Sequence, residues 1–296
     1  MARREWPLVA FTLLGQTAVG AFWLTAVPLA FAGRSAADLG GLSLGFAVYG
    51  GIAGLLGMAA ASSFFHLGRP WRAVRALNNL GSSWLSREIF GELVFLVLTA
   101  GLALIEWIRP GGTARAGVLR AAVLVTGASG LLFFYGMIRL YMLRTVPAWR
   151  DAHTPVSFLV TSLILGALAS ALFLRLTGSR LEGVGFPTIR SLALIAFAGM
   201  VAGLAVSVFL TPQVGIFGAR IATLLAPPKR KIVPFVVARG LLLAVSGSAI
   251  LMYSARLKIA PDATVNPLLW LAVAGGLAAE LAGRRLFYAL YSRVGI

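Results

Sequence analysis

The stretch PVSFLVTSLILGALASALFL, residues 155–174, decides the fold class because it contains no charged side chain. About 20 apolar residues in helical conformation span the roughly 30 Å hydrocarbon core of a membrane. Within lipid, a single segment satisfies all its backbone hydrogen bonds internally only when it is helical. The sequence therefore predicts a transmembrane α-helix here.

Stretches of this kind recur along the whole chain. The 296 residues are 59% hydrophobic and only 12% charged, and the mean hydropathy is +0.90. A water-soluble globule of this length could not stay dispersed with such a composition. We therefore predict an all-α fold, a polytopic membrane helical bundle of about eight transmembrane helices that forms a single integral membrane domain over residues 1–296. The predicted spans are 7–32, 42–64, 88–108, 118–141, 155–177, 189–211, 234–256 and 267–290.

The chain is strongly basic, with 26 Lys and Arg residues against nine Asp and Glu residues. In a soluble domain this excess would suggest nucleic acid. Here the charge lies in loops between apolar blocks, which favours roles in orientation, lipid binding and partner docking. An even number of spans puts both termini on one side, together with connections 65–87 and 212–233. That side carries 17 of the basic residues, so the positive-inside rule predicts cytoplasmic termini, although a docked partner would require the same charge.

Two further features limit the function. The chain has no cysteine, so any iron–sulfur cluster or thiolate-bound zinc belongs to another subunit. The start, Met1-Ala2-Arg3-Arg4, superficially resembles a signal peptide. The apolar stretch from Pro7 to Ala32 is too long for a signal peptide, so we interpret it as a retained first span.

The chain has two histidines, His66 at the end of the second span and His153 just before the fifth. A transmembrane haem b needs two axial ligands on facing helices within the bilayer, whereas both histidines fall at one margin. We therefore expect no haem and no metal site. At this margin the imidazole of His66 could hydrogen-bond a quinone carbonyl and exchange a proton. The alternative is a helix-end histidine that bonds a backbone carbonyl or a lipid headgroup.

The third span begins with two acids one turn apart, Glu88 and Glu92, and Ser86 is the expected N-cap. Acids inside a membrane are costly, and they indicate a proton path or a contact to a quinol. The alternative is structural, with Glu88 stabilised by the helix dipole and by a pair with Arg87.

The fourth span ends on the same side with Arg139 and Tyr141. Arg139 lies about one turn inside the apolar block, so we expect it either to extend outward to the interface or to pair with Glu88 or Glu92. Tyr141 lies at the membrane interface, where aromatic residues are common.

The other acids within the spans are interpreted as structural. Glu106 approaches the opposite surface, and Glu280 can pair with Arg284 one turn later. A small-solute transporter would show polar residues in the middle of its spans, broken helices and repeat symmetry between its halves. The sequence shows few of these signs, so transport is a minor alternative.

Several groups of residues in about the first 165 positions form a joint pattern: Glu5-Trp6-Pro7-Leu8 with Gly15-Gln16, Phe65-His66-Leu67-Gly68-Arg69-Pro70 with Ala76-Leu77-Asn78, Leu85-Ser86-Arg87-Glu88-Ile89, Arg139-Leu140-Tyr141, Thr145-Val146-Pro147-Ala148-Trp149 and His153-Thr154-Pro155. This pattern resembles the DMSO reductase anchor subunit family, the membrane component of a three-subunit molybdopterin oxidoreductase. The second half of the chain matches only as four further spans.

The resemblance implies an eight-helix anchor without haem in the cytoplasmic membrane of a bacterium or archaeon. Such an anchor binds menaquinone or ubiquinone and exchanges electrons directly with an iron–sulfur subunit, which serves a molybdopterin catalytic subunit. The terminal reaction then takes place outside this chain. The resemblance places His66 and Glu88 at the quinone site, and the further candidates are Arg69, Glu92, Arg139 and Tyr141.

The direction of electron flow is left open. Family members that reduce DMSO work with exported catalytic subunits, whereas relatives that oxidise sulfite keep theirs in the cytoplasm and reduce quinone. A docking face that is also cytoplasmic favours the sulfite dehydrogenase arrangement as the alternative. A purely structural anchor, whose partner supplies the whole quinone site, is a third possibility.

Overall fold

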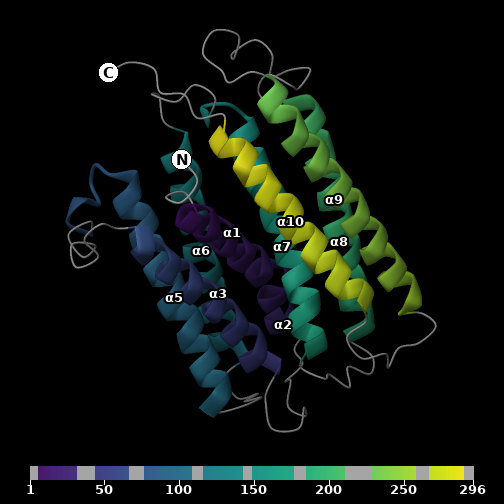
Figure 1. Ribbon diagram of the computed structural model, residues 1–296. Coiled ribbons are helices and arrows are strands. Elements are labelled where there is room, and N and C mark those ends of the chain that lie inside the picture. The colour runs from purple at the N-terminus through teal and green to yellow at the C-terminus, as the bar shows by residue number, and fades with distance from the viewer. Residues whose placement is uncertain are drawn as a thin grey trace.

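A computed structural model describes residues 6–31, 44–66, 77–108, 116–142, 149–176, 185–210, 229–257 and 267–289. These residues form a bundle of long helices without a strand among them (Figure 1). The first span is composite, with α1 (Trp6–Ala21), a π-helical turn η1 (Phe22–Ala26) and α2 (Val27–Phe31). The other elements are α3 (Leu44–His66), the 3₁₀ turn η3 (Leu77–Asn79), α5 (Trp84–Ile108), α6 (Ala116–Tyr141), α7 (His153–Leu176), α8 (Gly185–Ala205) with the π-helical turn η6 (Val206–Leu210), α9 (Lys229–Arg256) and α10 (Pro267–Ala289).

The predicted all-α membrane bundle is confirmed, and each of the eight predicted spans coincides with a long helix. Seven of these helical segments are long and apolar enough to cross a membrane. The eighth helix, α10, carries Glu280, Arg284 and Arg285 and is not among the seven. Its two charged residues Glu280 and Arg284 are nevertheless buried against other helices, at 1% and 3% exposure.

The eight spans are arranged as two four-helix halves with the same order of neighbours. In the first half, α1 packs on α3, α3 on α5, α5 on α6 and α6 back on α1. In the second half, α7 packs on α8, α8 on α9, α9 on α10 and α10 back on α7. In Figure 1, α3, α5 and α6 accordingly lie to one side of the central helices, and α8, α9 and α10 lie to the other.

The first helices of the two halves, α1 and α7, form the main contact between them. Gly20 and Gly166 allow the close approach, because a Cβ atom on Gly20 would lie 2.0 Å from the Ser162 carbonyl oxygen and one on Gly166 would lie 2.6 Å from the Gly20 backbone. Small residues permit such backbone contact between membrane helices. The halves therefore meet at like positions of like helices.

Candidate functional site

Two acids are buried where α5 packs against α6. Glu88 and Glu92 are 2% and 3% exposed. A Cβ atom on Gly136 of α6 would lie 3.3 Å from the Glu88 Cα, and one on Gly91 of α5 would lie 3.0 Å from the Phe133 Cα. The glycines bring the helix backbones together and enclose both acids.

The start of α5 differs in detail from the prediction. The helix begins at Trp84, and the Ser83 hydroxyl accepts a hydrogen bond from the Ser86 backbone N–H at 3.3 Å. Ser83 is therefore the N-cap. Ser86, the predicted cap, is a buried residue of the first turn.

The acids are not neutralised by the arginines that the sequence suggested. Arg87 donates hydrogen bonds to the Leu80 carbonyl oxygen at 2.8 Å and to the Gly81 carbonyl oxygen at 2.6 Å. The guanidinium carbons of Arg87 and Arg139 lie 4.4 Å and 4.8 Å from the centre of the Trp84 ring. The predicted pairs of Glu88 with Arg87 and of Arg139 with either acid are therefore wrong, and exposed Arg139 follows the outward alternative.

Each acid keeps an oxygen without a partner. The Oε1 atoms of Glu88 and Glu92 are buried and accept no hydrogen bond from any described residue. An unpaired polar atom in a low-dielectric interior is costly, so it marks a place where a donor from outside the chain is favourable. A hydroxyl-bearing molecule such as a quinol fits these two oxygens, because each can accept a hydrogen bond and a proton from it.

Tyr141 lies in a buried aromatic cluster at the same end of the bundle. Its hydroxyl lies 2.7 Å from the hydroxyl of Tyr288 on α10, so the two tyrosines share a hydrogen bond across the two halves. Its ring packs edge-on against Trp149, Phe158 and Phe287, with centroids between 5.5 and 5.6 Å away. The sequence placed Tyr141 at the membrane interface, whereas the structure buries it at 7% exposure.

The remaining predicted residues are only partly described. The helix α3 ends at His66, as the sequence predicted, but the His66 side chain and all of Arg69 lie outside the described residues. His153, the other histidine, is 4% exposed, and neither ring nitrogen has a hydrogen-bond partner among the described residues.

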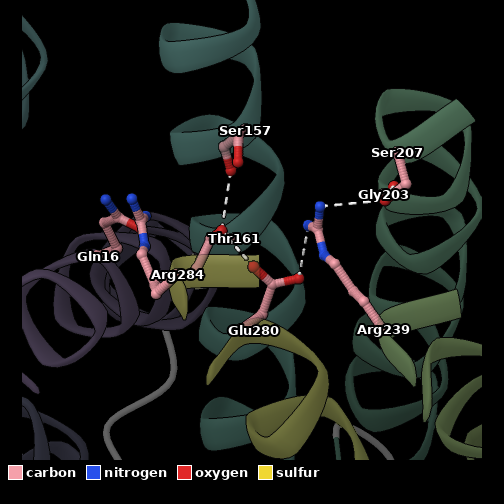
Figure 2. Close-up of polar contacts among 8 residues, drawn as sticks. All are labelled: Gln16, Ser157, Thr161, Gly203, Ser207, Arg239, Glu280 and Arg284. Atoms are coloured by element: carbon pink, nitrogen blue, oxygen red, sulfur yellow. Dashed lines mark hydrogen bonds and ion pairs between the residues drawn. The ribbon is translucent and has the colours of Figure 1, made fainter. Parts of the chain in front are cut away.

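A second buried polar network lies in the other half of the bundle (Figure 2). The Arg239 guanidinium on α9 forms an ion pair with the Glu280 carboxylate on α10 at 3.0 Å and hydrogen-bonds the Ser207 hydroxyl at 3.1 Å. The Thr161 hydroxyl on α7 lies 2.5 Å from the other oxygen of Glu280. Arg284 donates to the amide oxygen of Gln16 on α1. The network therefore connects α1, α7, α9 and α10.

Sequence reasoning missed this network. Glu280 pairs with Arg239, and not with Arg284 one turn away, so the predicted pair within α10 is wrong. The expectation of few polar residues inside the spans also fails for the second half. The available signal was the presence of three ionisable residues, Arg239, Glu280 and Arg284, inside the last two predicted spans, because such residues inside a membrane usually pair with one another.

Comparison with known proteins gives a consistent result. Residues 1–290 match the model of the family described as DMSO reductase anchor subunit (DmsC). The sequence is 32% identical to the third chain, lettered C, of the anaerobic dimethyl sulfoxide reductase of Escherichia coli K12 over 300 residues, covering 99% of this protein and 96% of the relative. It is 34% identical to the anaerobic dimethyl sulfoxide reductase chain YnfH of the same organism over 197 residues, covering 67% of each protein.

A more distant similarity connects the protein to a different reaction. It is 33% identical to a sulfite dehydrogenase subunit of Allochromatium vinosum over 146 residues, covering 46% of this protein and 45% of the relative. No solved structure matches the sequence. The family match spans nearly the whole sequence, and the chain therefore belongs to the DMSO reductase anchor subunit family.

Proposed function

We propose that this multi-pass membrane protein is the quinone-reactive anchor of its molybdoenzyme complex. In this proposal it exchanges electrons between the quinone pool and an iron–sulfur subunit that docks directly on it, and that subunit serves the molybdopterin subunit. The family assignment supports the anchor role. The observation that carries the quinone role is the buried acid pair, Glu88 and Glu92, whose free oxygens have no partner among the described residues.

The proposed site lies at the end of the bundle where α3 ends and α5 begins. A bound quinone supplies the redox chemistry, and this chain's residues supply binding and proton transfer. Glu88 and Glu92 accept protons at their Oε1 atoms, while His66 and Arg69, at the end of α3, hydrogen-bond the quinone oxygens. Tyr141 bounds the site on the α6 side, and Arg139 with Trp84 forms its outer edge.

The test uses the complete complex with His66→Ala and Glu88→Gln variants. Both should lose quinone-linked turnover, because each removes a group that binds the quinone or moves its proton. Assembly and activity with a soluble redox dye, which bypasses the quinone, should persist. Glu106→Gln is the matched control, since Glu106 is also a buried acid of α5 but lies at its other end. Retained quinone-linked turnover in both variants would refute the site.

A purely structural anchor is separated from this proposal by labelling. A photoreactive quinone analogue should crosslink to this chain near α3 and α5, and excess quinone should prevent the reaction. Labelling confined to the partner subunits would instead show that a partner supplies the whole site.

The second candidate function is the anchor of a sulfite dehydrogenase that reduces quinone from the cytoplasmic side. The similarity to the sulfite dehydrogenase subunit of Allochromatium vinosum and the 17 basic residues on the terminal side favour it. Reporter fusions at the C-terminus of α10 distinguish the arrangements. Green fluorescent protein should fluoresce there, and alkaline phosphatase should stay inactive, if the termini are cytoplasmic. The opposite result, together with a catalytic subunit on the exported side, would favour the DMSO-reducing arrangement.

A further inference from the structure

The buried network of the second half carries more positive than negative charge. Arg239 and Arg284 are 1% and 3% exposed, and Glu280, at 1%, is the acid buried beside them. Glu280 pairs with Arg239. Arg284 forms no ion pair among the described residues, and its contacts are the amide oxygen of Gln16 and the face of the Phe158 ring, 4.0 Å from the guanidinium carbon. A buried cation of this kind is costly to maintain, which points to a functional use of its charge.

A short polar path leads from Arg284 to the acid pair of the first half. Tyr288 follows Arg284 by one helical turn and therefore lies on the same face of α10. Its hydroxyl meets that of Tyr141 at 2.7 Å. The Tyr141 hydroxyl is close enough to both Glu88 and Arg284 to interact with them electrostatically. The path from the cation to the acid therefore crosses the boundary between the halves at one hydrogen bond.

The two halves are matched at this place. Gly136 lies five residues before Tyr141 on α6, and a Cβ atom there would meet Glu88 of α5. Gly283 lies five residues before Tyr288 on α10, and a Cβ atom there would lie 2.9 Å from Nε of Arg239 of α9. One half thus buries an acid behind its glycine and tyrosine, and the other half buries a cation.

We propose that Arg284 is a positioning residue for the quinone reaction, whose buried positive charge acts through the Tyr288–Tyr141 hydroxyl pair to favour the ionised form of Glu88. The inference rests on the proposed quinone site. The chemical reason is that a carboxyl group accepts a proton only when it is ionised, and a fixed cation in a low-dielectric interior stabilises that form.

The other groups around Glu88 set the field on which Arg284 acts. On α5 itself, Glu92 is a like charge that opposes ionisation of Glu88. From α6, Tyr141 faces it. The neighbouring helix α3 ends at His66 on this side. Arg87 and Arg139 are engaged at Trp84, so neither neutralises the acid directly.

The experiment measures the protonation of Glu88 by infrared spectroscopy of the purified complex. The carboxyl band that disappears in Glu88→Gln belongs to Glu88, and its loss with rising pH reports ionisation. In Arg284→Gln the band should persist to a pH about one unit higher, because the carboxylate has lost a stabilising cation. Tyr288→Phe should shift the band in the same direction.

Arg285→Gln is the matched control, since it removes the same charge from the next residue, which is exposed and lies over the Trp6 ring. Arg284→Lys keeps the charge and should keep the wild-type titration, which guards against an effect of misfolding. Equal titrations of Glu88 in Arg284→Gln and Arg285→Gln would overturn the inference while leaving the quinone site intact. A shifted titration with no effect of Glu88→Gln on quinone turnover would instead refute the proposed site.

Discussion

At the scale of single residues, the strongest buried interaction described is the ion pair between Arg239 and Glu280. Both side chains are 2% exposed, and the carboxylate is shared with the Thr161 hydroxyl. Attraction between two buried charges barely repays their loss of hydration, but an orphaned partner pays the full cost. The pair therefore contributes little net free energy while it is intact, and its disruption is expensive.

We expect Glu280→Ala to lower the free energy of unfolding by about 3–5 kcal/mol, because Arg239 is left buried without a counter-charge. The measurement is the thermal denaturation midpoint of the solubilised complex. The double variant Glu280→Leu with Arg239→Leu removes both charges and should be clearly more stable than Glu280→Ala. A double variant as unstable as the single one would show that the ion pair itself, and not the orphaned charge, determines the loss.

At the scale of helices, close backbone contacts at glycine position α1 against α7 and α5 against α6. A Cβ atom at Gly20 would lie 2.0 Å from a backbone oxygen, which cannot move aside as a flexible side chain could. At Gly54 of α3, by contrast, a Cβ atom would meet nothing within 4 Å. The same substitution should therefore have opposite effects at the two positions.

We expect Gly20→Ala to destabilise the protein by about 1–3 kcal/mol through overpacking. Gly54→Ala should be neutral or stabilise by up to roughly 1 kcal/mol, because alanine favours the helix. Thermal denaturation of the two variants under identical detergent conditions measures the difference. Equal midpoints would contradict the close contact between α1 and α7.

The sequence predicts the helices well and their partners poorly. Apolar blocks of spanning length locate all eight helices, because the thickness of the membrane fixes their length. Pairing depends on which face of each helix meets which neighbour, and these faces have almost no amphipathic pattern in a chain whose lipid side is as apolar as its core. This is why Arg87, Arg139 and Glu280 were each assigned a neighbour in sequence that the structure replaces with another partner.

The candidate site shows the same division. Glu88 and Glu92 could be singled out because an acid inside an apolar block is conspicuous and has a stated cost. The link from Tyr141 to Tyr288 could not, since the two residues are 147 positions apart and tyrosine is ordinary near a membrane surface. Long-range contacts of this kind leave no local trace in one sequence.

At the scale of the whole molecule, each half closes on itself, because its fourth helix packs back on its first. Each half therefore buries its own helix contacts before the two halves meet at α1 and α7. We expect a chain divided between α6 and α7 to assemble when the two pieces are produced together in one cell.

Co-purification of the second piece with a tagged first piece measures this assembly. The matched control is a chain divided between α5 and α6, which separates the fourth helix of the first half from its neighbours. That pair of pieces should assemble poorly. Equal recovery from both divisions would mean that the halves are not the units of assembly.

Contact between like residues, Gly20 with Gly166 and Tyr141 with Tyr288, has a consequence for the ancestry of the protein. A four-helix protein that forms a symmetric pair places each residue near its axis against its own copy. Fusion of two such genes would preserve these self-contacts while freeing the copies to diverge. One copy could then acquire acids and the other cations, so that a pair of identical subunits became a single chain with two unlike faces towards one site.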